Sequence, residues 1–265
     1  MRGTHFSSIL NRKMKTMRRF PPTVWLCASL AFLGSMACGR GNQNPGPIRA
    51  AVVSKETARA DAAPLVADTS ARRVVVLGDS LTAGLGLPPK EAYPTRLQER
   101  INDEGLKYSI VNAGVSGDTS AGGLARLDWA LDGDVRVLIV ALGGNDGLRG
   151  LPATQLTQNL SQIIERAQAR GIRVILAGME APPNYGFDYA ASFHKVYPAL
   201  AKKYRIGLVP FLLEGVGGIA ALNQPDGIHP TAEGARIVAD NVWTVLKPLL
   251  EAESQQVARG RAVGQ

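Results

Sequence analysis

Residues 72–82 read RRVVVLGDSLT, and this stretch decides how the rest of the chain can fold. The apolar run at 74–77, three valines and a leucine, is typical of a strand that is buried on both faces. Gly78 ends the strand and Ser80 follows, so we expect a tight turn there with the Ser80 hydroxyl exposed. A serine at this place also serves as the N-cap of a helix. The residues alone leave both interpretations open.

Similar patterns recur along residues 72–250. Residues 109–111 with their flanks, 135–142 and 172–177 have the composition of buried strands. Helical spacing is found at 92–104, 156–169, 187–204 and 231–250, and Gly171 is placed to end the second of these helices. Strands that alternate with helices predict a parallel sheet covered on both faces, in a single three-layer α/β/α domain. Functional sites of such sheets gather at the carboxyl ends of the strands.

Two further strand ends carry polar or glycine-rich segments. The second strand runs into Asn112-Ala113-Gly114-Val115-Ser116-Gly117-Asp118, and the third runs into Gly143-Gly144-Asn145-Asp146. Glycines at these points let the backbone turn sharply beside a polar side chain. Taken singly, the first segment is explained as a flexible loop and the second as an ordinary asparagine turn.

The three histidines of the chain narrow the chemistry. A serine nucleophile needs a base, and His5 lies in the N-terminal leader. His194 falls within a predicted helix, where we expect it to pack or to face solvent. His229 lies in the run Asp226-Gly227-Ile228-His229-Pro230, in which a carboxylate precedes the imidazole by three residues. A loop that carries base and orienting acid together suits a catalytic triad, although an exposed histidine in a glycine turn remains the alternative.

Taken together, these segments resemble the four sequence blocks of the SGNH (GDSL) hydrolase family. The blocks are Gly78-Asp79-Ser80-Leu81, Gly114, Gly143-Gly144-Asn145-Asp146 and Asp226-Gly227-Ile228-His229-Pro230, in the family's order and at comparable spacing. Residues 182–186 (PPNYG) and the last helical stretch are similar to the bacterial thioesterase, lysophospholipase and arylesterase subfamily. One departure is Thr231, where asparagine is frequent. The resemblance covers residues 72–250 and implies a flavodoxin-like three-layer fold with a mostly parallel sheet.

The resemblance also implies roles for individual residues. Ser80 would be the nucleophile, His229 the general base and then acid, and Asp226 the carboxylate that orients it. The oxyanion hole would consist of the backbone N–H groups of Ser80 and Gly114 and the side-chain amide of Asn145. The implied reaction is hydrolysis of short- to medium-chain acyl esters or thioesters through an acyl-enzyme, with no metal or organic cofactor.

We expect the substrate to be lined by two loops, with Pro183, Asn184 and Tyr185 from one and Gly217 and Ile219 from the other. Within the family, a carbohydrate or peptidoglycan O-deacetylase or acyltransferase of the cell envelope is the main alternative, and a non-catalytic binding module is a further one. An α/β-hydrolase is disfavoured because its G-x-S-x-G elbow is absent, residue 82 being threonine. A nucleotide-binding protein is also disfavoured, because the sequence contains no G-x-x-x-x-G-K-[ST] motif.

The N-terminus has the pattern of a secretory signal. A basic stretch at 13–19 precedes an apolar run at 24–33, and Ser35 and Ala37 supply the small residues of a cleavage site. We therefore expect residues 1–37 to be a signal peptide, with Met14 or Met17 as possible starts. Cys38 follows a segment that resembles a lipobox, so we expect a periplasmic or cell-envelope lipoprotein tethered to the membrane through Cys38. Plain secretion and an uncleaved anchor are the alternatives. Residues 38–71 are expected to be a flexible linker, and 251–265 an unstructured tail.

Composition and charge agree with this division. The 265 residues are 45% hydrophobic and 20% charged, enough to bury one ordinary core. The net charge of the chain is +8. Six basic residues and no acidic ones lie before residue 38, so the rest of the chain carries a net charge of only +2. This balance gives no electrostatic reason to expect nucleic-acid binding. Cys27 and Cys38 lie in or beside the leader, so we expect no disulfide and no cysteine-bound metal in the folded domain.

Overall fold

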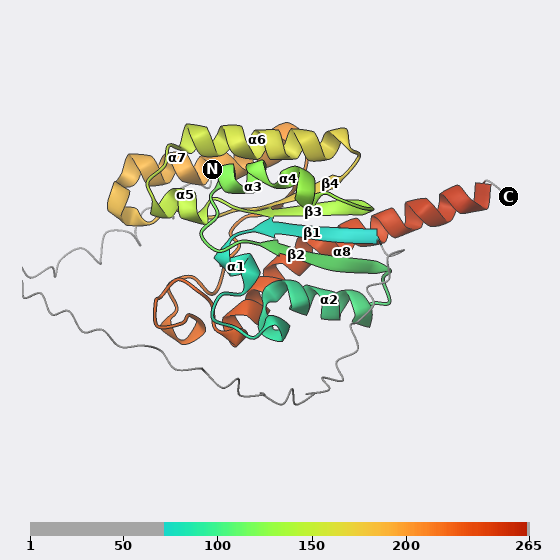
Figure 1. The fold of residues 1–265 in the computed structure, drawn as a ribbon, viewed down its shortest axis with the longest axis horizontal. Helices are drawn as coiled ribbons and strands as arrows, with labels where there is room; N and C mark the ends of the chain where they lie inside the picture. The colour runs from blue at the N-terminus through green and yellow to red at the C-terminus, as the bar shows by residue number, and fades with distance from the viewer. Residues whose placement is uncertain (1–71, 264–265) are drawn as a thin grey trace, which may run out of the picture. The chain divides into compact units, whose positions relative to one another are not determined.

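The computed structural model describes residues 72–263, which form a five-stranded parallel sheet with helices on both faces (Figure 1). The strands are β1 (Arg72–Gly78), β2 (Tyr108–Gly114), β3 (Val135–Ala141), β4 (Arg173–Ala177) and β5 (Gly207–Val209). Their order across the sheet is β2-β1-β3-β4-β5, and each neighbouring pair is parallel. The predicted three-layer α/β/α architecture is confirmed. The leader and the linker, residues 1–71, lie outside the described residues.

The helices divide between the two faces of the sheet. One layer consists of α1 (Ser80–Ala83), α2 (Tyr93–Asp103) and α8 (Ala232–Val263), below the sheet in Figure 1. The other consists of α3 (Ser120–Ala125), α4 (Leu127–Ala130), α5 (Gly144–Leu148), α6 (Ala153–Ala169) and α7 (Phe187–Tyr204). Three short 3₁₀ helices, η1 (Pro89–Glu91), η2 (Pro183–Tyr185) and η3 (Ala220–Leu222), lie in the connecting loops. No helix among the described residues combines the length and apolarity that a membrane crossing requires.

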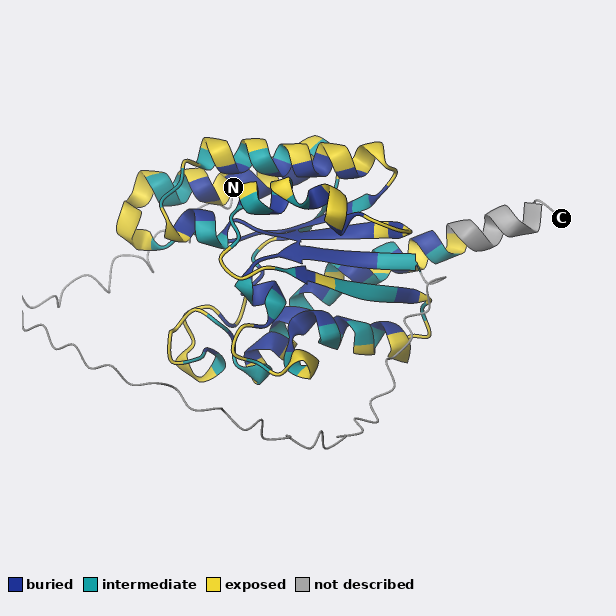
Figure 2. Cartoon of the chain, viewed as in Figure 1, coloured by how far each residue is buried: buried dark blue, intermediate teal, exposed yellow. Residues whose placement is uncertain are grey.

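The core lies between the sheet and the two helical layers (Figure 2). β1 and β3 occupy central positions, and their apolar runs are buried, as a strand covered on both faces requires. On α6, the predicted apolar face of Leu156, Leu160, Ile163 and Ala167 is fully buried against this core. The helix ends at Ala169, and Gly171 then adopts a left-handed φ of 71°, which confirms its role as the stop.

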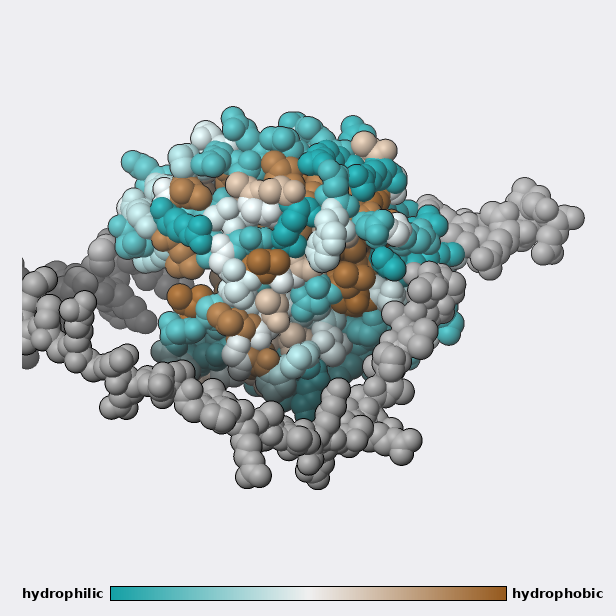
Figure 3. All heavy atoms as spheres, viewed as in Figure 1, coloured by the Kyte–Doolittle hydropathy of each residue, from teal (hydrophilic) through white to brown (hydrophobic). Residues whose placement is uncertain are grey.

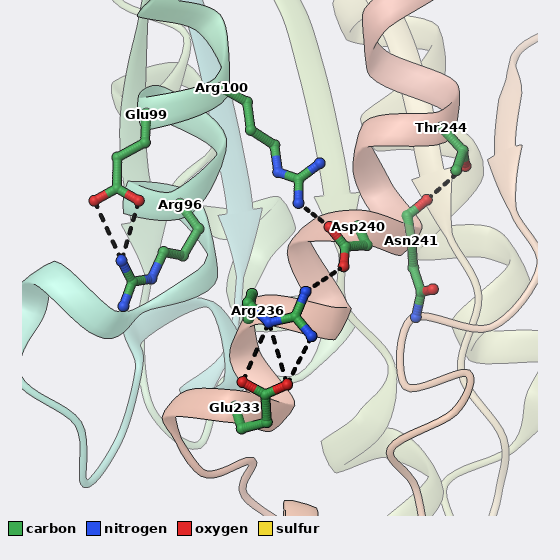
Figure 4. A network of polar contacts seen from close by, with 8 residues as sticks. All are labelled: Arg96, Glu99, Arg100, Glu233, Arg236, Asp240, Asn241 and Thr244. Carbon is green, nitrogen blue, oxygen red and sulfur yellow. Dashed lines mark hydrogen bonds and ion pairs between the residues drawn. The ribbon is translucent and has the colours of Figure 1, made fainter. Parts of the chain in front are cut away.

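A charged network joins α2 to α8 on the outer surface of the lower layer (Figure 4). Arg100 of α2 pairs with Asp240 of α8, and Arg236 Nη1 donates to the other oxygen of Asp240 at 3.1 Å. Arg236 also pairs with Glu233 at 2.6 Å. These side chains are partly exposed, so each pair contributes little by itself. Together they fix which residues of the two helices face one another.

Two sequence expectations differ from the structure. The strand β5 was not expected, because three residues are too few to show a periodic pattern. We expected an unstructured tail from residue 251. This expectation is wrong as far as Val263, because α8 continues past the end of the expected domain. Glutamate, alanine, glutamine and arginine dominate this segment and are good helix formers. In addition, Glu253 is buried and the Ser254 hydroxyl donates to the Leu250 carbonyl at 2.8 Å.

Candidate active site

The register of the three neighbouring strands brings the predicted site segments together. Gly78, the last residue of β1, pairs with Gly114 of β2 on one side and with Ala141 of β3 on the other. The three strands therefore end side by side, at the left of the sheet in Figure 1, where α1 begins. Apolar residues are also found at this left end of the surface in Figure 3.

Ser80, His229 and Asp226 form a continuous chain of hydrogen bonds. The Ser80 hydroxyl lies 2.9 Å from His229 Nε2, and His229 Nδ1 lies 2.6 Å from Asp226 Oδ2. The second carboxylate oxygen, Asp226 Oδ1, accepts from the backbone N–H groups of Ile228 at 2.9 Å and His229 at 3.0 Å. These bonds to His229 and Ile228 lower the pKa of Asp226 to about 2, so it remains a carboxylate over the useful pH range. Such an arrangement can deprotonate a serine hydroxyl and stabilise the resulting imidazolium.

The loop that carries Asp226 and His229 is tied to the turn that carries Ser80. Gln224 Nε2 donates to the carbonyl of Leu85, just after α1, at 2.8 Å and to the carbonyl of Pro230 at 2.9 Å. The Gln224 N–H donates to the His229 carbonyl at 2.7 Å. Gly227 adopts a φ of 71°, which closes the turn between acid and base. His229 and Ser80 are thus held against each other although 149 residues separate them.

Asn145 lies in the first turn of α5, which follows β3, and it borders the same pocket as Ser80. Its Nδ2 group donates to the backbone carbonyl of Asp118 at 2.9 Å and lies 3.3 Å from Asp79 Oδ2. Gly143 permits the sharp turn that precedes it, with a φ of 113° that L residues rarely adopt. The carboxamide nitrogen of Asn145 is thereby oriented by two acceptors.

The packing of α1 against β2 explains the glycine at position 114. A Cβ there would lie 2.3 Å from the backbone nitrogen of Ala83, so glycine is required by the close approach of α1 to β2. The Gly114 N–H donates to Asn112 Oδ1 at 3.0 Å. A substrate oxygen at this N–H would therefore have to share or replace the bond to Asn112.

Arg126 forms hydrogen bonds that connect the end of β1 to the loop after β2. Arg126 Nη2 donates to the Gly78 carbonyl at 2.9 Å, and its Nε donates to Asp118 Oδ2 at 2.6 Å. Both side chains of the pair are only 18% exposed, so the interaction is less screened than a surface pair. Arg126 thus fixes the residue whose carbonyl accepts from Asn145.

A pocket of about 510 Å³ opens beside Ser80, a volume that suits a small organic ligand. Of the five expected lining residues, Pro183 and Gly217 border the pocket. Asn184, Tyr185 and Ile219 do not border it. They are exposed near its rim, and the Tyr185 hydroxyl donates to the Leu148 carbonyl at 2.9 Å.

Sequence reasoning missed several lining residues. Met179 and Glu180 follow β4, and Phe211 follows β5. The rule that sites gather at strand ends would have identified the first two. It could not identify Phe211, because β5 itself was not expected. His194 lies outside the triad, as expected, and its Nδ1 is 2.6 Å from Glu180 Oε1. Among residues 72–263, no group of three or more His, Cys, Asp or Glu side chains is arranged to hold a metal ion.

Asp79 is a buried carboxylate that the sequence analysis gave no role. Its side chain caps α1, with Oδ1 accepting from the Leu81 N–H at 3.0 Å, and the residue is 3% exposed. Loss of hydration on burial raises the pKa of Asp79 from 3.8 to about 6. Well below pH 3.8 the group is neutral in both folded and unfolded chains. As the pH rises from 3.8 to about 6, the unfolded chain loses this proton before the folded protein does, so stability falls; above this range both are charged and no further stability is lost.

We therefore predict that Asp79→Asn gains stability relative to the unmodified protein as the pH rises. The difference in unfolding free energy should shift in favour of the variant by about 2.5 kcal/mol between pH 4 and pH 8, whatever its value at pH 4. Urea denaturation at several pH values measures this shift.

Asp226→Asn is the matched control, with the opposite sign. The folded-state pKa of Asp226 is lowered, so its carboxylate contributes stability above its unfolded pKa and loses it as the pH falls. Asp226→Asn should accordingly lose stability relative to the unmodified protein as the pH rises from 2 to 5. A difference for Asp79→Asn that stays constant with pH would contradict the charged, buried state of Asp79.

Comparison with known proteins identifies the family. Residues 76–237 match the GDSL-like lipase/acylhydrolase family. Esterase TesA of Pseudomonas aeruginosa is 48% identical over 187 residues, 70% of this chain and 93% of that protein. Thioesterase 1/protease 1/lysophospholipase L1 of Escherichia coli K12 is 39% identical over 186 residues, 70% of this chain and 88% of that protein. The crystal structure of AlinE4, an SGNH-hydrolase family esterase, superposes with a TM-score of 0.57 at 44% identity, covering 72% of this chain and 96% of that one. The chain thus belongs to the GDSL-like lipase/acylhydrolase family, the SGNH hydrolases, and is a carboxylic ester hydrolase.

Proposed function

We propose that Ser80 is the nucleophile of this esterase, that His229 is its general base and then acid, and that Asp226 orients His229. The observation that carries this assignment is the unbroken hydrogen-bond chain from Ser80 through His229 to Asp226 at the wall of the pocket. His229 takes the Ser80 proton as Ser80 Oγ attacks the acyl carbonyl, and it then gives that proton to the leaving alcohol or thiol. Water, deprotonated by His229, cleaves the acyl-enzyme in the second half of the reaction.

Asn145 is proposed as the main side-chain donor of the oxyanion hole, with the backbone N–H groups of Ser80 and Gly114. In the attack, the carbonyl oxygen becomes negative and is stabilised by donors that are already oriented. The two acceptors around Asn145 keep its nitrogen, and not its oxygen, toward the site.

For the substrate, we propose short- to medium-chain acyl esters of aryl alcohols, together with thioesters and lysophospholipids. This rests on the names of the relatives, an esterase, an arylesterase and a thioesterase/lysophospholipase. The pocket adds a constraint on charge. Its lining includes Asp79, Glu180 and His229 but, within the described chain, no lysine or arginine. We therefore propose that uncharged acyl groups are preferred.

The nucleophile is tested by replacing it. Ser80→Ala should fold normally and lose essentially all hydrolysis of 4-nitrophenyl butyrate, because no other hydroxyl is bonded to His229 in the described structure. A fluorophosphonate should label the unmodified protein at Ser80 alone, as peptide mass spectrometry would show. Labelling at Ser116 or Ser120 in the neighbouring loop would refute the assignment.

The oxyanion donor is tested by removing its amide. Asn145→Ala should lower kcat by roughly 10²–10³-fold with little change in KM, since the bond strengthens only as charge develops. Asn145→Asp should be at least as harmful, because it places a carboxylate at the oxyanion. Turnover must be counted per fluorophosphonate-titrated site. A well-folded Asn145→Ala within threefold of the unmodified enzyme would end this assignment.

The charge preference is tested with two acyl groups of equal length. We expect 4-nitrophenyl hexanoate to be hydrolysed faster than mono-4-nitrophenyl adipate, whose chain ends in a carboxylate. Removal of the pocket charge by Glu180→Gln should narrow the ratio of their kcat/KM values roughly fivefold, the effect of one partly screened charge. Glu214→Gln, an exposed carboxylate outside the pocket lining, is the matched control. Equal ratios in all three proteins, or faster turnover of acetylated sugars than of hexanoate, would contradict the proposed substrate class.

We further propose export, with residues 1–37 removed and Cys38 carrying the lipid of an envelope lipoprotein. The support is the leader pattern and the cysteine that directly follows its small residues. Several acyl chains at Cys38 would anchor the domain stably, whereas one would bind a membrane only marginally. Mass spectrometry of the native N-terminus should show a diacylated Cys38. An unmodified Cys38 or a different cleavage site would refute the lipoprotein proposal.

A further inference from the structure

Asp79 contacts both halves of the site through different oxygens. Oδ1 accepts from the Leu81 N–H at 3.0 Å, which caps the short helix that begins with Ser80. Oδ2 lies 3.3 Å from Asn145 Nδ2, and the residue borders the pocket together with Ser80 and Asn145. The carboxylate therefore connects the proposed nucleophile to the proposed oxyanion donor.

Capping of α1 does not by itself require a carboxylate. Serine, threonine and asparagine cap helices about as well, and none of them carries a charge into the interior. At 3% exposure the charge of Asp79 is costly to bury, as its raised pKa reflects. The chain thus holds a destabilising group beside the nucleophile although a neutral residue would serve the cap. A serine or threonine cap would lack the contact that the second oxygen of Asp79 makes with Asn145, and this contact is a reason to keep the carboxylate.

The second oxygen selects the orientation of the Asn145 carboxamide. One N–H of this group donates to the Asp118 carbonyl at 2.9 Å, and the other donates to Asp79 Oδ2 at 3.3 Å at the border of the pocket. In the flipped orientation, the carboxamide oxygen would face a carbonyl and a carboxylate, both of which only accept hydrogen bonds when Asp79 is ionised. The longer contact of 3.3 Å is weak enough for this N–H to turn toward an arriving oxyanion.

We propose that Asp79 is a positioning residue of the reaction, which holds the Asn145 carboxamide with its nitrogen toward the substrate while it caps the helix of Ser80. This inference rests on the proposed role of Asn145. Asp79 acts through Asn145 and does not touch the reacting atoms itself. Its removal should therefore lower kcat through misorientation of the oxyanion donor and leave ground-state binding nearly unchanged.

Two substitutions separate this role from helix capping. Serine at position 79 keeps an acceptor for the Leu81 N–H but is too short to reach Asn145. Asparagine keeps the shape, yet its single oxygen can satisfy only one of the two donors and its NH₂ must face the other. If the contact with Asn145 matters, Asp79→Ser and Asp79→Asn should both lower kcat by about tenfold with KM within about twofold.

The decisive measurement is a double-mutant cycle with Asn145→Ala, using 4-nitrophenyl butyrate and titrated active sites. Because Asp79 acts through the Asn145 amide, Asp79→Ser should cause no further loss of kcat once that amide is gone. Counting sites with the fluorophosphonate restricts the comparison to folded enzyme. If Asp79→Ser yields no titratable sites, Asp79→Asn takes its place in the same double-mutant cycle.

Two results would overturn the proposal. Asp79→Ser with a kcat within threefold of the unmodified enzyme would reduce Asp79 to a helix cap. Full additivity of Asp79→Ser and Asn145→Ala would show that Asp79 acts by another route. Failure of the underlying site assignment is distinguishable, because Asn145→Ala alone would then leave kcat unchanged, or the fluorophosphonate would label a serine other than Ser80.

Discussion

The in-register pairing of β1 with β2 and β3 is the constraint on which the site depends. Because Gly78 stands opposite both Gly114 and Ala141, the chain leaves all three strands at one level of the sheet. A shift of one strand by a residue would move its polar segment by about 3.3 Å along the strand. That displacement exceeds a hydrogen bond length. The strand register therefore places Ser80, Gly114 and Asn145, the proposed nucleophile and oxyanion donors, at one edge of the sheet.

The polar contacts refine what the sheet provides. Arg126 bonds to the carbonyl of Gly78 and to the side chain of Asp118, and so joins the end of β1 to the loop after β2. Asp118 in turn presents its carbonyl to Asn145. A second buried carboxylate, Asp146, accepts from the backbone N–H of Ser120 at 2.8 Å and from its hydroxyl at 2.5 Å, which fixes the start of α3 against the turn of Asn145. The Asn145 carboxamide is thereby held in place before charge develops on the substrate, and only its longer bond to Asp79 has to be exchanged.

How far the sequence predicts this structure depends on the length of each element. The helix at Phe187–Tyr204 coincides with the expected range, and the buried strands were found from runs of valine, leucine and isoleucine. These signals are strong because burial of a long apolar face repeats over several turns or residues. The strand Gly207–Val209 is too short to show a periodic pattern of apolar residues. It follows Arg205, whose backbone has a left-handed conformation that the sequence does not predict. The continuation of α8 was missed because a polar segment without an apolar face resembles an unstructured tail in the sequence, even when its residues are good helix formers.

The same distinction applies within the site. His229 could be found because the chain has only three histidines, whereas Ser80 and Asn145 were found because four short motifs together resemble a known family. By contrast, the pocket wall at Met179 and Phe211 consists of ordinary apolar residues, which become lining residues only through the folding of distant loops.

The site is finally assembled from two parts of different origin. The segments that follow β1, β2 and β3 carry Ser80, Gly114 and Asn145, the proposed nucleophile and oxyanion donors, whereas Asp226 and His229, the proposed acid and base, come from a loop that follows the last strand and precedes α8. This loop is joined to the first part by the Gln224 bond to Leu85, in addition to the bond between His229 and Ser80. Because Asp226 is half exposed and bonded mainly within its own loop, it moves with His229 as one unit. Asp226 and His229 therefore keep their mutual geometry even if the loop shifts relative to the sheet, and in the proposed triad the contact between His229 and Ser80 is the one that depends on how the loop sits against the sheet.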